Sequence, residues 1–157
     1  MRIGLISDTH GMLRPAVFAA FGDSTDLILH AGDIGAVDIL TELRTIAPVH
    51  AVHGNTDGFE VQAEAPEVVE VVLKGRKIAM THGHLLGSPT PQRLLATFPE
   101  ADIIVFGHTH KPLIERAGGR LVVNPGAAGP ARFRLRPTVA ILTLDTAEPS
   151  VELVELD

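Results

Sequence analysis

Short runs of apolar residues that end abruptly in polar residues recur along the chain. The first run, residues 3–6 (IGLI), is followed at once by Ser7-Asp8-Thr9-His10. Apolar runs of this length, bounded by glycine and polar residues, are typical of buried strands. On this pattern we expect strands at residues 3–6, 26–29, 49–52, 68–73, 77–80, 102–106, 113–115, 120–123, 138–144 and 151–156.

Apolar residues at helical spacing separate several of these runs. The predicted helices are residues 14–21, 37–46 and 91–98. Pro15 suits the first turn of the first helix and Gly22 suits its C-terminal cap, while Thr90 is a typical N-cap for the third. Residues 58–66 show no hydrophobic period and are expected to form a loop.

The order of these elements predicts the fold class. In the first half, three strands alternate with helices, which is typical of parallel sheets with helical crossovers. In the second half, strands are joined by short turns at residues 74–75, 117–119 and 147–150, which is typical of hairpins. We therefore expect a single α/β domain over residues 1–157, with two mixed sheets in the core and helices outside them.

Composition narrows the classes of function. The 157 residues include 13 basic and 19 acidic ones, for a formal net charge of -6, and Lys and Arg form no cluster suited to nucleic acid or a membrane. No apolar run approaches the roughly 20 residues that span a bilayer, and no signal-peptide pattern opens the sequence. We expect a soluble cytoplasmic protein. The absence of cysteine excludes a thiolate zinc site and a cysteine nucleophile.

Residues of the types that commonly bind metals follow five of the predicted strands. In chain order they are Asp8 with His10, Asp33, Asn55 with Asp57, His82 with His84, and His108 with His110. Ligands gather beyond the carboxyl ends of strands in α/β sheets, and side chains two residues apart on an extended chain point the same way. We therefore expect these groups to meet at one rim. Such ligands suit Mn, Fe, Co, Ni or Zn, and they fit two ions about 3.5–4 Å apart that share a carboxylate.

The ordered set of motifs resembles a known family. The motifs are Asp8-x-His10, Gly32-Asp33, Gly54-Asn55-x-Asp57, His82-Gly83-His84 and Gly107-His108-x-His110. They resemble those of the calcineurin-like metallophosphoesterases, and more closely those of the small single-domain phosphodiesterases of bacteria and archaea. The resemblance covers nearly the whole chain. It implies a four-layer α/β/β/α sandwich of two mixed sheets with flanking helices, and a dinuclear metal centre in which manganese is expected first.

The resemblance also assigns ligands and function. The first ion would be held by Asp8, His10 and His110, and the second by Asn55, His82 and His108. Asp33 would bridge the two ions. The implied activity is hydrolysis of a small phosphodiester by in-line attack of a metal-bridging hydroxide.

Further polar residues are expected to serve catalysis or substrate binding. Asn55 would contact the substrate, and His84 would contact it or donate a proton, with a supporting or solvent-exposed position as the alternative for His84. His53 would approach a phosphate oxygen, with a surface histidine as its alternative. Asp57 would support catalysis by orienting a ligand imidazole or by capping its turn.

Two positions depart from the pattern of the family. Many larger relatives have a histidine at the position of Thr56, where it interacts with the scissile phosphate and protonates the leaving group. Threonine cannot act as an acid near pH 7. Ala127 stands where a serine usually follows Asn-Pro-Gly. The threonine puts efficient hydrolysis of esters with poor leaving groups in doubt, unless His84 or His53 substitutes for the histidine; the alanine removes a hydroxyl near the rim.

Alternatives remain open at the level of the whole protein. The same site would serve a phosphomonoesterase or nucleotidase, and the fold would serve a protein-binding scaffold like the retromer subunit of similar architecture. The C-terminal hairpin is expected to offer an exposed edge for a homo-oligomer. Residues 132–136 (RFRLR) are interpreted as a solvated face, with phosphate steering by Arg132 as the alternative.

Overall fold

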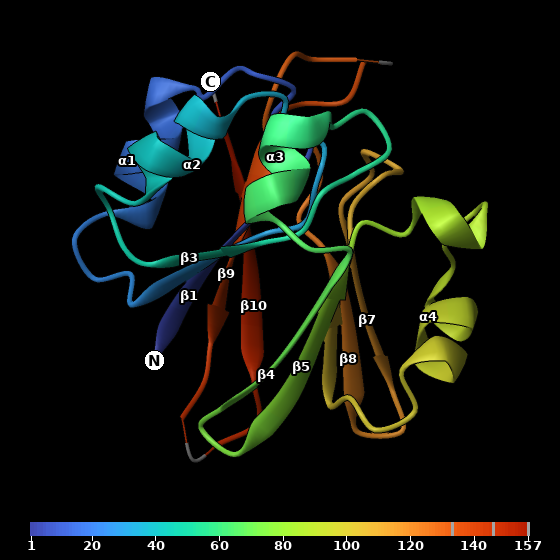
Figure 1. Ribbon diagram of the computed structural model, residues 1–157. Helices are drawn as coiled ribbons and strands as arrows, with labels where there is room; N and C mark the ends of the chain where they lie inside the picture. The colour runs from blue at the N-terminus through green and yellow to red at the C-terminus, as the bar shows by residue number, and fades with distance from the viewer. Residues whose placement is uncertain (133, 146, 157) are drawn as a thin grey trace.

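Two five-stranded sheets form the centre of the molecule (Figure 1). The computed structural model describes residues 1–132, 134–145 and 147–156. The strands of the first sheet, in spatial order, are β10 (Ser150–Glu155), β9 (Thr138–Thr143), β1 (Arg2–Ile6), β2 (Leu27–His30) and β3 (Val49–Ala51). Strands β1, β2 and β3 are parallel, whereas β9 is antiparallel to both of its neighbours.

The second sheet is also mixed in strand direction. Its strands, in spatial order, are β4 (Val68–Leu73), β5 (Arg76–Thr81), β6 (Ile103–Val105), β8 (Arg120–Asn124) and β7 (Leu113–Ala117). Strands β5, β6 and β8 are parallel, and β4 and β7 form antiparallel hairpins at the two edges. Lys74 and Gly75, with φ of 50° and 75°, make the β4–β5 turn, since two consecutive positive φ angles match the twist of a tight hairpin.

Helices cover the outer faces of both sheets. They are α1 (Pro15–Phe21), α2 (Val37–Leu43), α3 (Phe59–Glu64), the 3-10 turn η1 (His84–Leu86) and α4 (Pro91–Thr97). Figure 1 shows α1 and α2 on one side of the molecule and α4 on the opposite side. The molecule therefore has the α/β/β/α order of layers that the sequence predicts.

Three apolar clusters correspond to the three interfaces between these layers. Side chains alternate along each strand, so Leu5 packs between the sheets while Ile6 packs under the helices of the first sheet. Likewise Ile103 packs between the sheets and Ile104 packs under α4. At Gly4 the Phe21 ring of α1 lies so close that an added Cβ would be 2.8 Å from it. The near-continuous apolar runs of the sequence thus belong to strands that are buried on both faces.

Two predictions differ from the structure: one expected loop contains a helix, and one expected helix is shorter. Residues 58–66 contain helix α3, which the sequence analysis took for a loop. The helix has six residues and buries only Val61, so it is too short to show a hydrophobic period. Helix α2 ends at Leu43, and Ile46 packs against the same cluster from the turn that follows. The caps at Gly22 and Thr90 are confirmed, because the Gly22 N–H bonds to Phe18 O and the Thr90 side chain accepts from the Arg93 N–H.

The strand directions bring distant parts of the chain to one rim. Ile6, His30 and Ala51 are paired neighbours at the ends of β1, β2 and β3, and Met80 pairs with Val105 near the ends of β5 and β6. The loops that leave these five strands all begin at the same edge of the sandwich. Within the described residues, no helix has the length and apolar character needed to cross a membrane.

Candidate metal centre

The predicted ligands lie in loops whose backbone is unusual. Five of the seven described non-glycine residues with positive φ belong to the predicted ligand set: Asp8 (54°), His10 (47°), Asp33 (52°), His108 (72°) and His110 (64°). The extended backbone expected for Asp8 with His10 and for His108 with His110 is therefore wrong, although the side chains of Asp8 and His10 do approach each other. Left-handed backbone is disfavoured for residues with a Cβ, so surrounding contacts must hold these side chains in place.

Backbone hydrogen bonds hold the β1 and β2 loops side by side. The N–H of Asp8 bonds to Gly32 O at 2.9 Å, and the N–H of His10 bonds to Asp33 O at 2.9 Å. The Asp8 carboxylate then reaches the second sheet, because its Oδ2 accepts from the Ser7 hydroxyl at 2.7 Å and from the His108 N–H at 3.2 Å. These contacts leave Asp8 Oδ1 free to face the imidazoles.

One group of donor atoms forms around Asp8, His10 and His110. Asp8 Oδ1 lies 3.3 Å from His110 Nε2 and 3.8 Å from His10 Nε2. The two Nε2 atoms are 3.4 Å apart. These three residues are the ones that the resemblance assigns to the first ion.

A second group forms around Asp8, Asp33 and His82. His82 Nε2 lies 3.3 Å from Asp33 Oδ2 and 3.8 Å from Asp8 Oδ1. The His82 Nδ1–H donates to Ala31 O at 2.8 Å, which leaves Nε2 as the free nitrogen of the ring. Asp33 Oδ2 is also 3.8 Å from His10 Nε2, so this oxygen lies between the two groups.

The buried polar atoms of these groups fit a pair of divalent cations. Asp8 and His82 are fully buried, yet Asp8 Oδ1 and His82 Nε2 have no hydrogen-bond partner within the described residues. A buried donor or acceptor without a partner is strongly destabilising. Carboxylate oxygens and imidazole nitrogens are common ligands of borderline divalent ions, so bound cations would give each of these atoms a partner.

The charge states of these groups also favour metal binding. Burial acts to raise the pKa of Asp33, but the nearby His82 ring and the Thr56 N–H outweigh it and hold that pKa well below its usual range. Burial lowers the pKa of His10 and of His108, which keeps both rings neutral. Burial opposes protonation of His82 as well, but Asp33 and Asp8 raise its pKa, so a proton there occupies the position that a cation would take.

Asn55 and His108 extend the site into a cavity of about 240 Å³. Its described lining residues are His10, Asp33, Asn55, Thr56, His108, Thr109, His110 and Arg132. Asn55 is exposed at this wall. The His108 ring centre lies 5.2 Å from that of His82, so His108 faces the second group. The structure thus brings all seven predicted ligands to one place.

Glycines next to the ligands let the loops approach closely. An added Cβ at Gly54 would lie 2.1 Å from Asp33 Oδ1. At Gly32, where φ is 102°, it would lie 2.7 Å from His82 Nδ1. The Gly-Asp and Gly-Asn pairs of the motifs therefore reflect contact between the loops as well as turning of the chain.

The remaining predicted site residues have different positions. Asp57 accepts three backbone N–H groups, from Gly35 on Oδ1 at 2.9 Å and from Gly54 and Ile34 on Oδ2 at 2.9 Å and 3.1 Å. Its carboxylate thus ties the β2 loop to the β3 loop, which matches the capping alternative in the sequence analysis.

His84 and His53 lie beside the second group of donor atoms. The His84 ring centre is 5.5 Å from that of His82 and 6.4 Å from that of His108. Burial lowers the pKa of His84, and the charge of His53 contributes to the same effect. His53 forms a hydrogen bond from its Nδ1 to Ala65 O at 2.8 Å, and it does not line the cavity.

Two further residues support the loops of the site: Asn124, and His30, for which the sequence pattern indicates a structural role. Asn124, predicted only as part of a turn, donates through Nδ2 to Gly107 O and to Thr109 Oγ1, both at 3.1 Å, and so holds the loop of His108 and His110. His30 is fully buried and accepts the Gly32 N–H at Nδ1, which leaves Nε2–H to donate to Thr9 Oγ1 at 3.0 Å. A buried polar residue at a strand end was the available signal in both cases.

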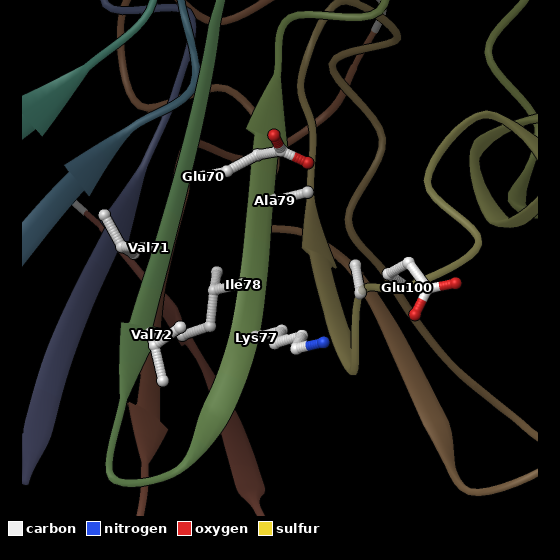
Figure 2. Close-up of a pocket in the computed structure, with 8 residues that line it drawn as sticks. Glu70, Val71, Val72, Lys77, Ile78, Ala79 and Glu100 are labelled. Carbon is white, nitrogen blue, oxygen red and sulfur yellow. The ribbon is translucent and has the colours of Figure 1, made fainter.

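A second cavity, of about 270 Å³, shows that volume does not identify the site. Figure 2 shows its lining from β4, β5 and the turn before β6, with Glu70, Lys77 and Glu100 among apolar residues. It contains none of the predicted ligands. The chemistry of the donor atoms, and not the size of the hollow, distinguishes the metal centre.

Known proteins resemble the chain over most of its length. Residues 1–147 match the calcineurin-like phosphoesterase superfamily domain. A protein of Methanothermobacter thermautotrophicus named probable metallophosphoesterase is 37% identical over 161 residues, which cover 98% of this chain and 92% of that protein. A solved archaeal phosphodiesterase has a TM-score of 0.81 at 26% identity, over 99% of this chain and 100% of its own. Vps29 of Entamoeba histolytica, solved with Zn²⁺, has a TM-score of 0.80 at 24% identity over 99% of each chain, which shows a shared fold alone.

Acid is expected to destabilise the protein through His30. Burial lowers the pKa of His30 from 6.5 to about 4. As the pH falls, the unfolded chain therefore binds this proton at a higher pH than the folded chain does. The contribution of neutral His30 to the free energy of unfolding is fully present above pH 6.5, and up to about 3 kcal/mol of it is lost as the pH falls toward about 4. We expect His30→Gln to show a shallower loss of unfolding free energy over this range in urea titrations. His50→Gln, at an exposed position of β3, is the matched control. An unchanged slope in His30→Gln contradicts this assignment.

Proposed function

The chain belongs to the calcineurin-like phosphoesterase superfamily, and we propose that it is a metal-dependent phosphodiesterase that hydrolyses a small phosphodiester. The observation that supports this most directly is the pair of donor groups around Asp8, with buried ligand atoms that have no hydrogen-bond partner within the described residues. The solved relative described as an archaeal phosphodiesterase supports the choice of a diester substrate.

We assign the ligands as the resemblance implies. Asp8, His10 and His110 would hold one ion, and Asn55, His82 and His108 would hold the other. Asp33 would be the shared ligand, in keeping with the position of its Oδ2 between His10 Nε2 and His82 Nε2. When bound, two divalent cations would lower the pKa of a water molecule and neutralise charge on the phosphoryl oxygens. Manganese is the ion we propose to test first.

The protein groups prepare this chemistry by fixing charge and orientation. Asp33 stays ionised and His10 and His108 stay neutral near pH 7, so no proton needs to leave them before they bind. Asp57 and Asn124 hold the ligand loops through backbone groups. We propose that water attacks phosphorus in line without a covalent intermediate on the chain: the sequence contains no cysteine nucleophile, and the histidines and Asp33 that line the cavity are assigned as metal ligands.

Thr56 limits the leaving groups that the site can expel. Its N–H bonds to Asp33 Oδ1 at 3.0 Å, and the residue lines the cavity. Its hydroxyl does not donate a proton near pH 7, and the lowered pKa of His84 leaves that ring largely unprotonated there. We therefore propose that the enzyme favours esters whose leaving groups depart as anions without protonation.

Two alternatives share parts of this picture. A phosphomonoesterase would use the same ligands and would prefer an aryl monoester over an aryl diester. A protein-binding scaffold, as suggested by the fold shared with Vps29, has no physical reason to bury ligand atoms without partners. The donor set therefore favours an enzyme.

Metal loading tests the proposed function. We expect the Mn-loaded protein to bind about two ions per chain and to hydrolyse bis(4-nitrophenyl) phosphate faster than 4-nitrophenyl phosphate, with activity lost on chelation. Asp33→Asn, which removes the bridging charge, is expected to lower kcat/KM by more than about 100-fold and to lower the metal content. Asp23→Asn, in an exposed loop, is the control with the same change in charge. Fewer than about one ion per chain after loading favours the scaffold.

Thr56→His is expected to broaden the range of leaving groups. An imidazole at this wall can protonate a departing oxygen, which contributes typically about 10²–10⁴-fold when well placed. The rate should rise for an alkyl aryl diester with a poor leaving group and change little for bis(4-nitrophenyl) phosphate. Thr56→Asn controls for a polar side chain without an acid. Equal relative rates for all three proteins contradict this role of position 56.

A further inference from the structure

We infer that Arg132 binds a non-bridging phosphoryl oxygen of the substrate, an inference that rests on the proposed function. Arg132 lines the cavity of the metal centre together with His10, His108 and His110. It is the only Lys or Arg among the described residues that line this cavity. The sequence analysis placed it on a solvated face, with phosphate steering as the alternative.

The segment before Arg132 is fixed against the β1 loop. The Ala128 N–H bonds to Ser7 O at 2.9 Å, and the Gly129 N–H bonds to Asp8 O at 3.2 Å. Arg14 Nε donates to Gly129 O at 3.1 Å from the other side. Arg132 follows this anchor by three residues, so its segment leaves the same loop that supplies Asp8 before it reaches the cavity wall.

The guanidinium of Arg132 is available for a ligand. Other arginines form ion pairs, such as Arg44 with Glu64, Arg116 with Glu148 and Arg136 with Glu155. Within the part of the chain that the structure describes, no acidic side chain lies within ion-pair distance of Arg132. Its charge nevertheless reaches the site, since it contributes to lowering the pKa of His10 after the larger effect of burial.

A phosphodiester presents the group that such an arginine recognises. Its two non-bridging oxygens share a negative charge, and a planar guanidinium donates to phosphate oxygens with well-matched geometry. The charge on these oxygens must be stabilised as the fifth ligand of phosphorus approaches. Thr56, which also lines the cavity, is neutral at the position where the resemblance places a histidine in larger relatives, so Arg132 supplies a cationic side chain that Thr56 does not.

Binding of inorganic phosphate separates this inference from the proposed function. We compare the Mn-loaded wild type with Arg132→Gln, Arg132→Lys and the control Arg134→Gln by calorimetry. Arg134 is exposed two residues along the same segment and does not line the cavity, so its replacement makes the same change in net charge. We expect Arg132→Gln to weaken phosphate binding by about 10- to 100-fold, as for loss of hydrogen bonds between charged groups. Arg132→Lys should lie between, because it keeps the charge and loses the fork.

Kinetics and metal analysis complete the test. For bis(4-nitrophenyl) phosphate, Arg132→Gln should raise KM and lower kcat/KM by a similar factor, with unchanged Mn content and melting temperature. Phosphate binding by Arg132→Gln within about twofold of the wild type overturns the inference, and so does an equal loss in Arg134→Gln. If the wild type binds phosphate through Arg132 but hydrolyses no phosphodiester, the proposed function fails and the inference stands.

Discussion

The carboxylate of Asp8 is the contact on which the site depends. One of its oxygens accepts a backbone N–H from the loop after β6, and the other faces imidazoles from both sheets. A single buried acid therefore joins the two halves of the sandwich and forms part of both donor groups. The apolar clusters hold the layers of the sandwich together, whereas the contacts of Asp8 position the loops at the rim relative to one another.

The convergence of several loops on one site is also visible in the backbone, which is left-handed at the predicted ligands. Asp8, His10, Asp33, His108 and His110 adopt positive φ angles. Each such conformation is disfavoured on its own, and here hydrogen bonds between loops compensate for it. Strain of this kind gathers where side chains must converge from several directions, which is the situation at this rim. Asp57, Asn124 and His30 supply much of the compensation through contacts with backbone groups.

Most of the strands, and the polar residues that meet at the rim, could be predicted from the sequence for a simple physical reason. Buried strands require continuous apolar runs, and a polar residue after such a run stands out, as Asp33 does after residues 26–29. The order of the layers came from the resemblance to the family. Three features were beyond this reasoning. Helix α3 is too short to show a period, the φ angles of Asp8 and His110 depend on contacts with other loops, and the segment before Arg132 is held by hydrogen bonds to a loop more than 100 residues earlier. Each of these is set by tertiary structure, and a linear pattern does not contain it.

The shared role of Asp8 has a consequence for the lifetime of the protein. Since Asp8 Oδ1 and His82 Nε2 lie buried without hydrogen-bond partners within the described residues, they place unfavourable polar atoms between the sheets. Under the proposed function, cations would bind these atoms in the folded chain alone, and by mass action their free concentration would contribute to its stability. The abundance of the protein in the cell would then follow the supply of the ion.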